Sequence, residues 1–71
     1  MTVTIKSFNN EKFYVYMEQT VRRGKSVIDV GICDVINGEV LSPFRQMSYH
    51  LNVKNANATY NRYVRYAKLN N

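Results

Sequence analysis

The dipeptide Asn37-Gly38 is the feature that most constrains how this chain can fold. It follows residues 27–36, which are β-branched and apolar on both faces, as in a central strand of a sheet. A two-residue type I′ turn needs positive φ at both central residues, and asparagine followed by glycine meets this need best. We therefore predict an antiparallel hairpin here, with residues 27–36 at the centre of a sheet.

The segment before this strand carries a period-two pattern. Its alternate residues form an apolar row, Phe13, Val15, Met17 and Val21, and a second row, Tyr14, Tyr16, Glu18 and Thr20. This alternation predicts a strand, and the polar, glycine-containing connection from Arg22 to Lys25 predicts a second hairpin. Val3 and Ile5 alternate with polar residues before the turn signal Asn9-Asn10, which indicates a first strand.

The pattern changes phase after Asn37-Gly38. Val40, Ser42 and Phe44 stand on even positions, whereas Met47, Tyr49, Leu51 and Val53 stand on odd positions. Pro43 lies at the change, and proline cannot donate to a β-ladder, so we expect a bulge or turn over residues 42–45. Residues 1–53 are thus predicted to form a meander-like antiparallel sheet of five strands, or of four if the last two form one bent strand.

The C-terminal segment has a helical period. Asn55 or Asn57 can cap a helix over residues 56–69. On a helical wheel one face carries Ala56, Tyr60, Tyr63, Val64 and Ala67, the other carries Asn61, Arg62, Arg65 and Lys68, and Tyr66 lies at the boundary. The first face is predicted to cover the sheet. The fold class is therefore α+β: one domain, residues 1–71, with one C-terminal α-helix packed on one face of an antiparallel sheet.

Length and composition limit how such a domain is stabilised and indicate its cellular compartment. The chain has 71 residues, 45% of them hydrophobic, so we expect a folded domain with a small core. One cysteine gives no disulfide framework, so efficient packing or a second copy of the chain is needed, and a homodimer is compatible with the sequence. We expect a cytoplasmic protein with no membrane association, because no signal-peptide pattern or apolar run of membrane-spanning length is present.

Searches for catalytic motifs lead us to expect a protein that is not an enzyme and uses no cofactor. Gly24-Lys25-Ser26 ends like a P-loop, but Gln19 occupies the position of the first glycine, and a strand is expected to follow. Cys33 fits a buried strand position, and His50 fits an exposed sheet face beside Ser48 and Asn52. One cysteine and one histidine cannot complete a metal site, so we expect no metal.

Positive charge dominates the second half of the chain. The net charge is +5, and Glu39 is the last acidic residue. Five basic residues follow it without an acidic neighbour: Arg45, Lys54, Arg62, Arg65 and Lys68. This distribution favours an acidic partner, either nucleic acid or an acidic protein surface, although charge of this size can also serve solubility alone.

Basic and aromatic residues together define the candidate site. If the helix covers the Phe13 row, Tyr14 and Tyr16 lie on the open face of the sheet, where they can stack on bases beside cations that neutralise phosphates. The candidate nucleic-acid-binding residues are Arg22, Arg23, Lys25, Arg62, Arg65, Lys68, Tyr14 and Tyr16. Ordinary cross-strand packing or a dimer interface also explains the two tyrosines.

In architecture, the segments FYVYMEQT, VRRGK and SVIDVGI, followed by the helix NATYNRYVRYAKL, resemble the small sheet-plus-helix DNA-binding domains of phage and transposon integrases. The strands around residues 40–53 depart from that layout. The leading interpretation is a small basic protein that binds nucleic acid, with DNA favoured. The alternative is a protein-interaction module, such as a phage-encoded or mobile-element-encoded inhibitor or adaptor that docks on an acidic partner surface.

Overall fold

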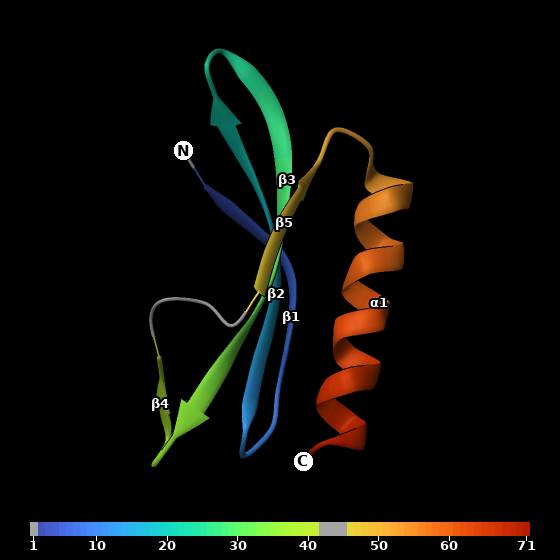
Figure 1. The fold of residues 1–71 in the computed structure, drawn as a ribbon. Coiled ribbons are helices and arrows are strands. Elements are labelled where there is room, and N and C mark those ends of the chain that lie inside the picture. The colour runs from blue at the N-terminus through green and yellow to red at the C-terminus, as the bar shows by residue number, and fades with distance from the viewer. Residues whose placement is uncertain (1, 42–45) are drawn as a thin grey trace.

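Five strands and one helix follow one another along the chain in the computed structural model, which describes residues 2–41 and 46–71 (Figure 1). The elements are β1 (Val3–Asn9), β2 (Phe13–Arg22), β3 (Lys25–Ile36), β4 (Glu39–Val40), β5 (Gln46–His50) and α1 (Val53–Leu69). All strand pairs are antiparallel. The α+β class and the C-terminal helix predicted from the sequence are therefore confirmed.

Two tight turns connect β2 to β3 and β3 to β4, as the sequence predicted. Between β3 and β4, Asn37 has φ 55° and Gly38 has φ 81°. Between β2 and β3, Arg23 has φ 53° and Gly24 has φ 76°. Positive φ at both central residues is the signature of the type I′ turn, whose twist matches that of the flanking strands.

The sheet is built around β3. The strand order is β1-β2-β3-β4, and β5 also pairs with β3. β2 pairs with residues 25–34 of β3. β5 pairs with residues 28–32 along the other edge of β3, and β4 pairs with residues 35–36. The expected bulge or turn at Pro43 lies outside the described residues. A register shift between Thr4 and Lys6 in β1 was not predicted.

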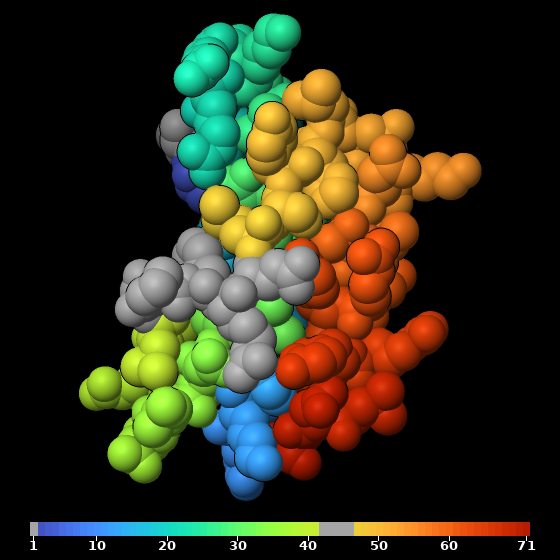
Figure 2. All heavy atoms as spheres, in the orientation of Figure 1, coloured from blue at the N-terminus to red at the C-terminus, as the bar shows by residue number. Residues whose placement is uncertain are grey.

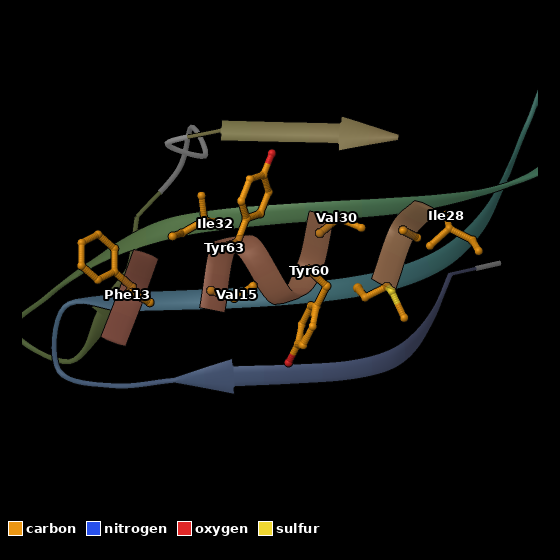
Figure 3. Close-up of a cluster of buried hydrophobic side chains, with 10 residues drawn as sticks. Phe13, Val15, Ile28, Val30, Ile32, Tyr60 and Tyr63 are labelled. Carbon is orange, nitrogen blue, oxygen red and sulfur yellow. The ribbon is translucent and has the colours of Figure 1, made fainter. Parts of the chain in front are cut away.

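The core lies between α1 and one face of the sheet. Val15 and Met17 of β2 and Val30 and Ile32 of β3 are almost fully buried there. Helix residues Ala56, Tyr60, Tyr63 and Ala67 are buried against them, as predicted. Figure 3 shows the Tyr60 ring directed toward β1 and the Tyr63 ring toward β5, so the two tyrosines extend the core to both edges of the sheet.

Val21 was expected to continue the apolar row of β2 but is 58% exposed. It lies beside the β2–β3 turn, and this hairpin projects past the sheet region that α1 covers (Figure 1). The row therefore loses its covering layer before the strand ends. Among the described residues, no helix is long and apolar enough to cross a membrane.

The start of α1 differs from the prediction. The helix begins at Val53, and its N-cap is Asn52, whose side-chain oxygen accepts a hydrogen bond from the backbone N–H of Asn55 at 3.2 Å. The expectation that Asn55 or Asn57 caps the helix is wrong, because both lie within its first turns. β5 ends at His50, so the chain enters the helix almost directly from the strand.

Candidate nucleic-acid interface

The basic residues at the β2–β3 hairpin lie at one end of the molecule. Arg22 and Lys25 face each other across the strand pair, and their positions in the alternation place them on the side of the sheet away from α1. Together with Arg23 they line an open hollow whose remaining walls are Val27, Tyr49 and Leu51. Figure 2 shows the atoms of this hairpin beside those of the end of β5. We call these six residues the hairpin hollow.

Arg22 is held in place by a buried carboxylate. Its guanidinium donates to Asp29 Oδ2 at 2.7 Å, and the Asp29 side chain is only 8% exposed, against 54% for Arg22. This hydrogen bond, reinforced by the negative charge of Asp29, raises the pKa of Arg22. The second carboxylate oxygen of Asp29 has no hydrogen-bond partner among the described residues. Arg22 is therefore fixed at the wall of the hairpin hollow while part of it still faces solvent.

Tyr14 and Tyr16 lie on the predicted side of the sheet, but Tyr16 is not exposed there. The two rings stack with their centroids 6.0 Å apart and 22° between their planes. Tyr16 is 4% exposed, and burial raises the pKa of its hydroxyl. Its ring lies over Gly31, where an added Cβ would come within 2.5 Å of it. The expectation of an open pair of stacking tyrosines is therefore wrong: the missing side chain at Gly31 lets Tyr16 pack against the sheet.

The cations of the helix lie elsewhere. Arg62 and Arg65 are exposed, whereas the opposite face of α1 is buried on the sheet. Lys68 is also exposed, but its Nζ lies 5.6 Å from the centre of the Phe8 ring, which directs it toward β1. The hairpin hollow is on the far side of the sheet from α1. The structure thus divides the predicted basic residues between two opposite sides of the molecule.

Three residues of this region were not predicted from the sequence. Tyr49 is 66% exposed and Leu51 73% exposed, and both join the basic hairpin in the hollow. Asp29 lies opposite Tyr49 in the strand register and pairs with Arg22. The apolar residues at odd positions of β5 were visible in the sequence. The side of the sheet on which they lie depends on the register between β5 and β3, which the sequence alone does not give.

The two faces of β5 explain why the prediction for His50 needs correction. Ser48 pairs with Val30, whose side chain faces the helix, and both Ser48 and His50 are half-buried on that side. Ser48 Oγ lies 3.3 Å from His50 Nε2 and 3.4 Å from Tyr63 Oη, so it links the strand to the helix. The polar side of β5 therefore packs under α1, and the apolar side, with Met47 and Tyr49, is the exposed one.

Cys33 and His50 lie on opposite sides of the sheet. Cys33 is fully buried, as predicted, and burial raises the pKa of its thiol to about 11. It pairs in the register with Tyr14 on the far side of the sheet, whereas His50 faces the helix. Within residues 2–41 and 46–71, no cluster of histidine, cysteine or acidic side chains could hold a metal ion.

Comparisons of the chain with models of known protein families, with curated protein sequences and with solved structures found no significant match.

Proposed function

We propose that this chain is a small non-enzymatic protein that binds nucleic acid through the hairpin hollow. DNA is the favoured ligand. The observation that carries the proposal is the meeting of Arg22, Arg23 and Lys25 with the exposed Tyr49 in one open hollow. Guanidinium and ammonium groups neutralise phosphates, and an exposed aromatic ring adds a surface for bases. No acidic residue lines this hollow among the described residues.

The charge of the hollow is available to a ligand to different degrees. Arg22 is engaged by Asp29, which positions it but offsets part of its charge. Neither Arg23 nor Lys25 forms an ion pair with any acidic residue that the structure describes. These two side chains are therefore the ones whose loss should weaken phosphate binding without removing a structural ion pair.

Titration of a fluorescent oligonucleotide at two salt concentrations tests the proposal. An Arg23→Ala/Lys25→Ala variant should bind more weakly. The negative slope of log association constant against log salt concentration should become shallower by about 1 to 2, since each lost phosphate contact contributes about 0.7 to 0.9. Arg62→Ala/Arg65→Ala removes the same charge from the outer face of α1 and is the matched control. Circular dichroism should show the same fold for all three proteins.

Three results would overturn binding through the hairpin hollow. The first is absence of binding by the wild type to single-stranded or duplex DNA or RNA at low salt. The second is an equal loss of affinity in both variants, which would show a general effect of net charge. If only the helix variant loses affinity, the interface belongs to Arg62, Arg65 and Lys68 on the outer face of α1.

One observation favours a second candidate, a protein-interaction module. Met47, Tyr49 and Leu51 present an apolar row that is between 48% and 73% exposed, and exposed apolar surface bordered by charge is typical of a protein-docking site. A partner with an acidic rim, or a second copy of the chain, would cover this row. Binding dominated by this apolar row should depend less steeply on salt than phosphate binding does. Equilibrium sedimentation of the purified protein measures the self-association that a second copy requires.

We place the protein in the cytoplasm, because its one cysteine, Cys33, is unpaired and a reducing compartment suits such a thiol. Recovery in the cytosolic fraction of its host checks this assignment.

A further inference from the structure

Tyr49 offers a free aromatic surface at a defined place beside the basic hairpin. It extends from β5 on the side of the sheet away from α1, directly across from Asp29 in the register. It is 66% exposed, in contrast to the buried Tyr16 on the same side of the sheet. Val27 and Leu51 line the same hairpin hollow, so the wall that carries the ring is partly apolar.

Three cations line the same hollow on its hairpin side. The Arg22–Asp29 pair at 2.7 Å holds one guanidinium at the wall of the hollow, and Arg23 and Lys25 add charges that no described acidic residue pairs with. A complementary ligand must therefore combine negative charge with a flat, partly apolar group. This combination recurs along every nucleic-acid strand, where phosphates alternate with bases.

The conformation of the nucleic acid decides whether its bases can reach the ring. In a duplex the bases are stacked on each other, so the ring could contact only the backbone or a groove edge. In a single strand a base can leave its neighbours and stack on an aromatic side chain, while the adjoining phosphates contact nearby cations. We infer that the hairpin hollow binds single-stranded nucleic acid, with one base stacked on Tyr49 and the flanking phosphates bound by Arg23 and Lys25. This inference rests on the proposed nucleic-acid function and specifies its substrate class.

Three probes separate base stacking from phosphate binding: a single-stranded oligo-dT, an abasic single strand of the same length, and a duplex. Tyr49→Ala should lose about 10-fold in affinity for oligo-dT, which is the range expected for one stacked base. Its affinity for the abasic strand and the duplex should stay unchanged. Tyr49→Phe should bind oligo-dT like the wild type, because it keeps the ring.

Met47→Ala is the matched control for truncation of an exposed side chain on the same strand and face, since Met47 does not line the hollow. It should leave all three affinities unchanged. Denaturant melts should show that each variant is folded under the binding conditions.

The failure of this inference differs from the failure of the proposed function. Base stacking is refuted if the wild type binds the duplex or the abasic strand as tightly as oligo-dT. It is also refuted if Tyr49→Ala keeps the wild-type affinity for oligo-dT while Arg23→Ala/Lys25→Ala binds more weakly. In both cases phosphate binding stands. If the wild type binds none of the probes at low salt, both are refuted, and the exposed row on β5 is left to a protein partner.

Discussion

Tyr16 packs over β3 at a position where residue 31 has no side chain. The ring occupies the space where a Cβ at position 31 would stand, at 2.5 Å. On this side of the sheet, away from α1, Tyr16, Cys33 and Asp29 are all at most 5% exposed. The glycine at position 31 of β3 thus determines whether Tyr16 of β2 is buried or exposed.

Gly31→Ala should destabilise the protein by about 1–3 kcal/mol, as overpacking of a tight site does, because the added methyl group must displace the Tyr16 ring. Denaturant unfolding measures the change. In the Tyr16→Leu background the same substitution should cost clearly less, since the far end of the ring is gone. Equal costs in both backgrounds would show that the ring does not occupy the space above Gly31.

The thiol of Cys33 should be unreactive in the folded protein. Its pKa, raised by burial from 9.0 to about 11, reduces the thiolate fraction at neutral pH about 100-fold, and the thiolate is the reactive species. Labelling with a thiol reagent should therefore be at least about 100-fold slower in buffer than in denaturant. Comparable rates would mean that Cys33 is accessible in the native state.

The same pKa shift makes a pH-dependent contribution to stability. Between about pH 9 and pH 11 the thiol of the unfolded chain loses its proton, whereas the thiol of the folded protein keeps it. The contribution of Cys33 to the stability of the folded state is therefore lost as the pH rises through this window. The Cys33→Ala variant should lack this part of the alkaline loss of stability. Urea melts of both proteins at pH 8 and 10 measure the difference.

At the scale of elements, the end of β5 and the start of α1 are joined by a short connection. Asn52 caps the helix, and its backbone carbonyl accepts from the N–H of Ala56 at 3.1 Å. At the other end of the helix, the Asn10 side-chain amide donates to the backbone carbonyl of Ala67 at 3.1 Å. The β1–β2 turn and the β5–α1 connection thus fix the two ends of α1 on the sheet.

Asn52→Ala should destabilise the protein by about 1 kcal/mol, because a first-turn N–H loses its side-chain acceptor. Asn55→Ala is the matched control and should change stability by less than about 0.5 kcal/mol, since Asn55 contributes only its backbone N–H to the cap. Chemical denaturation compares the two. A larger cost at Asn55 would contradict the assigned start of the helix.

At the scale of the whole molecule, the helix and the hairpin hollow occupy opposite sides of one sheet. The exposed cations of α1 face outward from the helical layer, and those of the hairpin belong to the other side. A single ligand cannot reach both sets without wrapping around the molecule. β3 supports this arrangement, because it pairs with β2 along one edge and with β4 and β5 along the other.

Native-state hydrogen exchange should follow this order of strands. Amides of β3 between Ile28 and Ile32 have paired strands on both edges and lie over the core, so they should exchange only with global unfolding. Amides of β1, an edge strand that is mostly exposed, should exchange faster. NMR-detected exchange resolves the two groups. Equal protection of both strands would contradict the central place of β3.

Local patterns in the sequence determined the elements of this protein. Positive φ at Asn37 and Gly38 depends on the steric preferences of these two residues alone, so the hairpin turn could be predicted from the sequence. The spacing of Ala56, Tyr60, Tyr63 and Ala67 likewise determined which face of the helix is buried. These features depend on residues close together in the chain, which is why composition and periodicity were sufficient to predict them.

The candidate site depended on the tertiary structure. Whether Tyr16 or Tyr49 is exposed is decided by Gly31 and by the register of β5 on β3, both of which involve strands distant in sequence. The ion pair between Arg22 and Asp29 and the separation of the two basic sets follow from the same register and from the side that α1 covers. A shift of one residue would exchange the faces of a strand, so only the assembled sheet could determine which side chains meet.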